Sequence, residues 1–319
     1  AMTDSSSSKT PFGVTEQLGL FLRSLRQRFG GFILLGLLML LAIIGIGIVV
    51  GGIGGGLIFA ILSATGRDFG DLAGPLAVAN TGNPLPLLFS LGPAAIIALV
   101  LWVVFHFFSS IFYTAPTQAG LSVLQNGKVE AGGSLGRGFG LLIKAGLVLL
   151  VITLAFTLVQ AIFVWLPAMV LPGSAGVMLS GLGNIPYILF AIIVGLALAP
   201  WPAVVVHEGK GLDALGRAAF LTKGYRLPIL GFGLLATLVI LAVCLGVFLV
   251  FALIGGLFIA VTSSAVGITI ASILGAIVGI PLLLGLMGGF GLATAVVYVR
   301  LVQIKEGSLS HKDVEEVFG

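Results

Sequence analysis

The longest uncharged stretch of the chain sets the strongest limit on its fold. From Leu227 to Val299 the sequence carries no Asp, Glu, Lys, Arg or His. Because a helix crosses a bilayer with about 20 mainly apolar residues, this stretch is long enough for two crossings. Its one polar cluster, VTSSAVG, divides it into predicted spans at about 227–261 and 266–299.

The rest of the chain repeats this pattern. Of the 319 residues 59% are hydrophobic and 8% charged, whereas soluble domains are about 25% charged. Four further apolar runs lie at about 31–62, 87–114, 141–170 and 185–206. The sequence therefore predicts an all-α, polytopic integral membrane protein with six transmembrane helices and short amphipathic interfacial helices on the cytoplasmic side. We expect a disordered tail over 1–14, an amphipathic interfacial helix over 15–30, the transmembrane domain over 31–304 and a cytoplasmic tail over 305–319.

The positions of the basic residues predict the orientation. Of the 15 lysines and arginines, all but Arg67 lie in the amino-terminal segment, in or beside the loops after the second and fourth spans, or in the carboxy-terminal segment. Loops rich in Lys and Arg stay on the cytoplasmic side, so both termini are expected to be cytoplasmic. The net charge of +4 follows from this orientation and favours contact with anionic headgroups, not with nucleic acid.

Charge is most concentrated in HEGKGLDALGRAAFLTKGYR, residues 207–226, which we call the elbow. Gly209 and Gly211 are expected to adopt positive φ and let the chain leave the fourth span. Asp213 is expected to begin a short helix, where the helix dipole favours it, and to pair with Arg217 one turn later. The apolar face of that helix would lie against the membrane. This face comprises Leu212, Leu215 and Ala219.

The elbow motif recurs along the chain. NGKVEAGGSLGRGF, residues 126–139, shares with it Gly-Lys and then Leu-Gly-Arg before a Phe. Residues 305–318 begin in a related way, and residues 16–32 resemble the later half of the elbow. The sequence thus predicts a unit of two spans and one charged elbow, present three times. In the amino-terminal copy, Arg23, Arg26 and Arg28 flank an apolar stripe. The stripe comprises Leu18, Phe21, Leu22, Leu25 and Phe29.

The elbow and the closing segment VYVRLVQIKEG resemble the membrane domain fused to some bacterial glycerophosphodiester phosphodiesterases, and its stand-alone six-helix relatives of unknown function. The matching positions are Pro202, Glu208, Ala214, Leu215, Arg217, Ala218, Lys223 and Gly224, with Tyr298, Arg300 and Glu306 in the closing segment. The resemblance covers about 15–307 and implies a six-helix bundle in a bacterial cytoplasmic (inner) membrane. It does not imply catalysis, because the phosphodiesterase activity of the fused proteins belongs to a separate soluble domain.

The residues themselves also argue against an enzyme. The three histidines, His106, His207 and His311, lie in separate regions without metal-ligand spacing, and no carboxylate falls inside a predicted span. We therefore expect no catalytic residues, no metal site and no cofactor. An enzyme would become the better hypothesis if Glu208, His207 and Arg300 surrounded one pocket.

Two kinds of residue inside the spans leave alternatives open. His106 and Gln160 are polar groups at membrane depth, where function is one explanation and a neutral histidine bonded to a neighbouring helix is another. Glycines four residues apart let helices pack closely, either within one subunit or in a homo-oligomer. These glycines are Gly47, Gly51 and Gly55, the pair Gly275 and Gly279, and the pair Gly285 and Gly289.

The basic residues of the elbow and closing segment are candidates for lipid-headgroup contact: Arg217, Lys223, Arg226 and Arg300. Alternatively they set orientation and form salt bridges, with Glu208 pairing to Arg217 or Arg226. Glu208, Gly209 and Asp213 would shape the elbow. We expect a non-catalytic lipid-interacting, membrane-organising or adaptor protein whose partners are membrane lipids, a second copy or another membrane protein. The alternative is a transporter or flippase of an amphipathic, lipid-like substrate.

Overall fold

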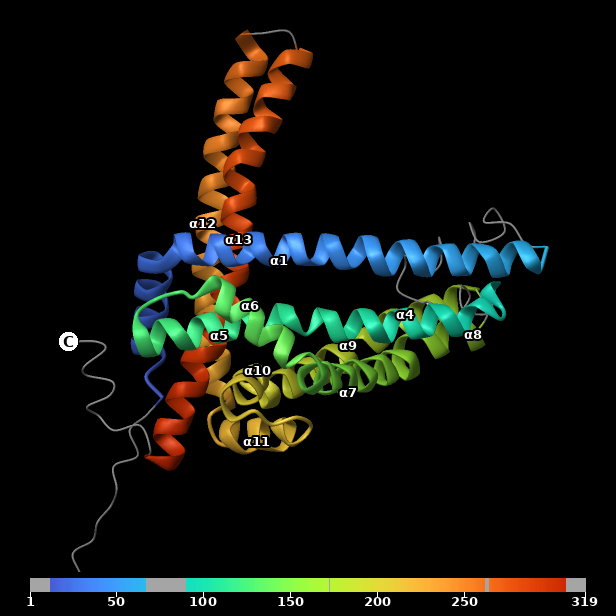
Figure 1. Ribbon diagram of the computed structural model, residues 1–319, viewed down its shortest axis with the longest axis horizontal. Helices are drawn as coiled ribbons and strands as arrows, with labels where there is room; N and C mark the ends of the chain where they lie inside the picture. The colour runs from blue at the N-terminus through green and yellow to red at the C-terminus, as the bar shows by residue number, and fades with distance from the viewer. Residues whose placement is uncertain (1–11, 67–89, 172, 262–263, 308–319) are drawn as a thin grey trace, which may run out of the picture. The chain divides into compact units, whose positions relative to one another are not determined.

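The computed structural model describes residues 12–66, 90–171, 173–261 and 264–307, and within them all regular structure is helical (Figure 1). Six helical stretches in this part of the chain are long and apolar enough to cross a membrane. They are Val14–Ala64, Ala94–Asn126, Leu142–Val170, Gly173–Glu208, Arg226–Leu257 and Gly275–Glu306. The all-helical fold class and the multi-pass architecture predicted from the sequence are thus confirmed.

The helix α1 (Val14–Ala64) runs through the predicted interfacial segment and the first span together. Its backbone leaves helical geometry at Arg28 (φ −119°, ψ 16°), just before the pair Gly30 and Gly31, and paired small residues are a common cause of kinks. Figure 1 shows the first turns, in dark blue, bent away from the rest of the helix. Phe12 is buried, so the tail predicted over 1–14 is too long; residues 1–11 lie outside the described part.

The second, third and fourth spans are each built from more than one helical piece. The second joins α4 (Ala94–Ser109) to α5 (Ile111–Asn126). The third joins α7 (Leu142–Gln160) to the π-helical η2 (Ala161–Trp165) and α8 (Leu166–Val170). The fourth joins α9 (Gly173–Leu198) to α10 (Trp201–Ala203) and the π-helical η3 (Val204–Glu208). Because α9 begins at Gly173, this span begins well before the predicted residue 185.

The last two spans are long single helices, α12 (Arg226–Val261) and α13 (Ser264–Glu306), which pack side by side (Figure 1). Because α13 continues to Glu306, the predicted cytoplasmic tail begins too early, and residues 308–319 lie outside the described part. Residues 87–89, at the predicted start of the second span, also lie outside it.

Contacts divide the chain into two compact units. One comprises 1–38, 112–141 and 196–319, and the other comprises 39–111 and 142–195. In the second unit α4 packs on α7, and Gly146 permits this approach, since a Cβ there would come 2.6 Å from the Phe107 ring. The first unit holds both elbow motifs.

The amino-terminal apolar stripe is present, but it packs on protein. The rings of Phe21 and Phe232 of α12 meet edge to face, with centroids 6.1 Å apart. Phe29 and Phe32 press against Gly285 and Gly288 of α13. The interfacial helix expected on the membrane surface is therefore a packed part of the first unit. Its basic residues Arg23, Arg26 and Arg28 are exposed.

The two copies of the elbow motif adopt the same local structure. Each forms a ten-residue helix, α6 (Ala131–Gly140) in the first copy and α11 (Asp213–Thr222) in the second. Each helix follows a glycine with positive φ, Gly127 at 65° and Gly209 at 68°. A third such glycine, Gly307 at 61°, ends α13. The repeat predicted from sequence thus corresponds to a repeated turn of the backbone.

The candidate site: an ion-pair cluster at the elbow

The elbow begins where the fourth span ends, at Glu208. Gly209 caps η3 in the left-handed conformation, as predicted, because only glycine takes that conformation without a steric penalty. Gly211 does not have the positive φ predicted for it. Asp213 is the first residue of α11, as predicted.

The face of α11 that packs on protein is a different one from the face predicted to lie against the membrane. Ala214, Ala218, Leu221 and Thr222 are buried, whereas Leu212 is exposed. The buried face packs on α10, η3 and α13. Small residues at 214 and 218 let α11 approach these neighbours closely, so burial against protein decides which face turns inward.

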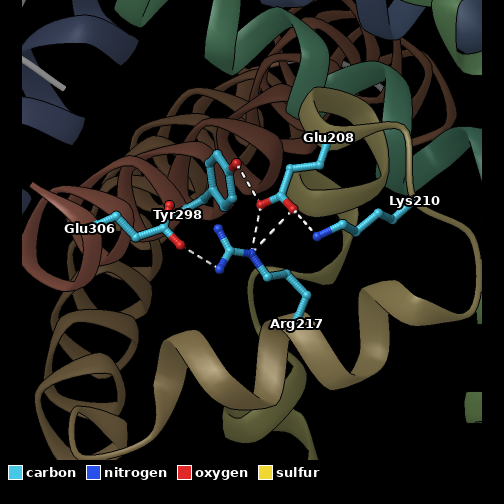
Figure 2. Close-up of polar contacts among 5 residues, drawn as sticks. All are labelled: Glu208, Lys210, Arg217, Tyr298 and Glu306. Carbon is cyan, nitrogen blue, oxygen red and sulfur yellow. Dashed lines mark hydrogen bonds and ion pairs between the residues drawn. The ribbon is translucent and has the colours of Figure 1, made fainter. Parts of the chain in front are cut away.

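The Glu208 carboxylate lies at the centre of a polar cluster (Figure 2). The Nε of Arg217 donates to both of its oxygens, at 2.9 and 3.2 Å. The Nζ of Lys210 lies 2.7 Å from Oε2, and the hydroxyl of Tyr298 donates to Oε1 at 3.1 Å. Glu208 is 15% exposed, so these donors replace most of the water that a free carboxylate would hold.

Arg217 also binds a second carboxylate. Its Nη1 lies 2.5 Å from Oε1 of Glu306 (Figure 2). The hydrogen bond to Glu306 raises the pKa of Arg217 above its ordinary value, against an opposing effect of burial, and Glu208 adds to the rise. The predicted pairing of Glu208 with Arg217 is confirmed. The pairing expected between Asp213 and Arg217 is wrong, because the carboxylates of Glu208 and Glu306 bind the guanidinium instead. One side chain thus ties α11 to the ends of the fourth and sixth spans.

Further contacts fix the same junction. The Nζ of Lys305 donates to the Lys223 carbonyl at 3.0 Å and lies over the rings of Phe220 and Tyr225, 5.4 and 5.6 Å from their centroids. The Thr222 hydroxyl donates to the Ala197 carbonyl at 2.9 Å. The end of α13 is therefore bound to the carboxy-terminal end of the short helix through Lys305 and to its middle through Glu306.

The first elbow motif makes a related contact. Arg137, the arginine of its Leu-Gly-Arg, donates from Nη2 to the Val206 carbonyl at 3.3 Å. Val206 lies in the last turn of η3, where backbone carbonyls lack partners along the helix. The arginines of both motifs therefore stabilise the cytoplasmic end predicted for the fourth span.

The four headgroup candidates fall into different surroundings. Arg217 belongs to the cluster, and Arg300 is 18% exposed, with its Nη2 3.8 Å from Oε2 of Glu16. Lys223 and Arg226 are exposed. The structure thus brings Glu208 and Arg217 together, but places the other three candidates outside the cluster.

Sequence reasoning missed the pairing partners of the cluster: Lys210, Tyr298 and Glu306. A signal for Glu306 was present, since Glu306-Gly307 repeats the Glu208-Gly209 pair at the end of the preceding unit. The proximity of Tyr298 depends on the packing of α13 and has no local signal.

The polar residues inside the spans make local contacts. The Nδ1 of His106 lies 2.9 Å from the Trp102 carbonyl of the same helix, so the bond expected to a neighbouring helix is wrong for this nitrogen. The His106 ring also contacts the ring of Trp102, with the centroids 4.0 Å apart and the ring planes tilted by 46°. Gln160 is half-buried where α7 meets η2.

The residues named for a possible enzyme do not gather at one point. His207 and Glu208 both lie beside Tyr298, with 5.6 Å between the rings of His207 and Tyr298. Arg300 instead lies beside Glu16 and Gln303. Among the residues that the structure describes, no three His, Cys, Asp or Glu side chains are grouped so as to hold a metal ion.

Comparison with known proteins found no matching family model, curated protein or solved structure. The family resemblance stays a prediction that rests on the elbow and closing motifs.

Proposed function

We propose that this chain is a non-catalytic protein of the bacterial inner membrane that binds anionic lipid headgroups at its cytoplasmic side and so organises lipid or another protein around it. One observation carries the proposal. Exposed cations stand within two helical turns before exposed apolar side chains in two of the helices long enough to cross a membrane. Lys223 and Arg226 precede the exposed Leu227, and Arg28 precedes the exposed Leu34.

This arrangement matches the layers of a bilayer leaflet. An apolar side chain that remains exposed in the protein belongs in hydrocarbon. A cation that precedes this side chain by one or two helical turns lies at the level of the lipid phosphates. A basic residue near an anionic surface contributes about 1 kcal/mol. Of the predicted headgroup contacts, Lys223 and Arg226 fit best. Arg217 is already bound by the carboxylates of Glu208 and Glu306, and the Arg300 side chain is mostly buried.

The test is lipid retention at fixed acyl chains. The protein is placed in nanodiscs of equal phosphatidylglycerol and phosphatidylcholine, and retained lipids are measured by native mass spectrometry. Replacing Lys223→Gln and Arg226→Gln removes two cations, so we expect the phosphatidylglycerol preference to fall roughly 30-fold at this position. The charge-conserving pair Lys223→Arg and Arg226→Lys is the matched control and should keep the preference. An unchanged preference in the glutamine variant would contradict the proposal.

Transport of an amphipathic, lipid-like molecule is the alternative, and it predicts a different result. Vesicles containing the protein would then exchange fluorescent phospholipid between leaflets faster than protein-free vesicles. Under the headgroup proposal the exchange rate equals that of protein-free vesicles.

A further inference from the structure

The hairpin of α12 and α13 carries an unusually long exposed apolar surface. On α12 this surface extends from Leu227, 78% exposed, to Leu257, 68% exposed. Thirty residues at 1.5 Å each make it about 45 Å long. No Asp, Glu, Lys, Arg or His interrupts it.

The exposed surface covers both sides of α12. Leu241 and Val250 are nine residues apart, two and a half helical turns, and therefore point in opposite directions. Both are exposed, as is Ile277 of the packed partner α13. A single protein partner would cover one side, and the described exposed positions offer no charge to set its register. Lipid acyl chains cover all sides at once, so they are the occupant that fits this surface.

The length of this surface exceeds an ordinary bilayer. A hydrocarbon core measures about 30 Å, and helices tilt by about 20° on average and up to about 40°. A 45 Å surface still spans about 42 Å at the average tilt and about 34 Å at the steepest. The exposed apolar surface of α1, from Leu34 to Phe59, is about 38 Å long by the same rise per residue.

We infer that the α12–α13 hairpin is matched to a hydrocarbon layer thicker than about 30 Å, and that the protein gathers phospholipids with long acyl chains around it. This inference rests on the proposed lipid-organising function and names the lipid class by its chains. A shorter lipid would leave apolar side chains in water at one end of the hairpin, whereas a long-chain lipid covers them.

The first test measures the depth of both ends. Leu227→Cys and Leu257→Cys are made separately with Cys244→Ala, which removes the one native cysteine, and are spin-labelled in vesicles of phosphatidylcholine with 22-carbon monounsaturated chains. We expect both labels to be accessible to oxygen and protected from a water-soluble nickel reagent. A nickel-accessible label at position 257 would overturn the inference. Because both positions are exposed, labelling leaves the packing intact.

The second test measures stability against chain length. In phosphatidylcholine vesicles with chains of 14 to 22 carbons, the unfolding temperature should rise up to 20 or 22 carbons. A maximum at 18 carbons or fewer would overturn the inference. The variant Leu253→Lys with Leu257→Lys shortens the apolar surface at its outer end, and its maximum should move to shorter chains.

Spin labels at Leu241→Cys and Val250→Cys distinguish an α12 surface covered by lipid from one covered by a second copy of the protein. Both should remain mobile without spin–spin broadening, whereas immobilised, broadened spectra on either side would overturn the inference in favour of a dimer. The headgroup is constant throughout these tests, and the chains are constant in the retention test. Failure of the chain-length tests would therefore leave the headgroup proposal standing. Failure of the lipid-retention test would leave the measured match to a thick hydrocarbon layer standing.

Discussion

Arg217 joins three segments that are far apart in the sequence. Glu208 ends the fourth span and Glu306 ends the sixth, and both carboxylates bind the same guanidinium. A lysine offers one compact ammonium group, whereas the planar guanidinium presents several donors in fixed directions. The arginine is therefore suited to holding two carboxylates on different helices.

Replacing Arg217 by methionine should destabilise this junction. Methionine keeps much of the length of the side chain but leaves Glu306 without its partner and Glu208 with only Lys210 and Tyr298. We expect a loss of about 1–3 kcal/mol in unfolding free energy, between the values for surface and buried pairs. Thermal unfolding in detergent measures it.

The matched control for this prediction is Arg226→Met. Arg226 is exposed, so its loss should change stability by no more than about 0.5 kcal/mol. A double-mutant cycle of Arg217→Met with Glu306→Gln should show a coupling between the two residues. Additive effects would mean that the pair contributes nothing to stability.

The residue scale also shows what sequence could supply. Glu208 and Arg217 are nine positions apart, within one elbow, so their pairing was among the possibilities open to sequence reasoning. Glu306 and Tyr298 reach the cluster only because α13 packs on α11, and hydropathy carries no information on which helices meet.

At the scale of elements, the glycines separate into two groups. A Cβ added at Gly120 of α5 would lie 2.7 Å from the Leu292 Cα of α13, a contact with backbone. At Gly47, Gly51, Gly55, Gly275 and Gly279 no described atom would lie within 4 Å of an added Cβ. Close packing within one subunit was one expectation at these five positions and is wrong for them, while packing against a second copy stays a prediction; Gly285 and Gly289 do meet α1. Spacing alone could not identify the positions where helices touch.

Gly120→Ala should therefore destabilise the protein. The new methyl group would meet the backbone of α13, which cannot move aside as a side-chain end can, so we expect a loss of about 1–3 kcal/mol. Thermal unfolding in detergent is again the measurement.

Gly279→Ala is the matched control for Gly120→Ala. It adds the same methyl group inside a helix with open space around it, and should leave stability unchanged or raise it by up to about 1 kcal/mol through helix propensity. Equal losses in the two variants would mean that α5 and α13 do not meet at Gly120.

At the scale of the whole molecule, composition and hydropathy were sufficient to predict the six helices that, in the described part of the chain, are long and apolar enough to cross a membrane. A bilayer forces every backbone group to find its partner within the span, so each long apolar run predicts a helix independently of its neighbours. The ends of the spans were predicted less well. The fourth span was placed too late because the glycine-rich start of α9 lowers the local hydropathy. The helix α1 begins 17 residues before the predicted first span because the amphipathic amino-terminal turns continue directly into that span.

The orientation of the six spans is the remaining prediction, and it follows from the uneven distribution of Lys and Arg. Single cysteines at Lys128 and Lys223, after the second and fourth spans, should react with a membrane-impermeant maleimide only after cells are permeabilised. A cysteine at Thr65, exposed at the end of α1, should react in cells whose cytoplasmic membrane is intact. Cys244→Ala is the background for all three and its unlabelled signal is the control. Because six crossings alternate in direction, labelling of Lys128→Cys and Lys223→Cys from opposite sides would contradict the number of spans, and labelling of both from outside would contradict the orientation alone.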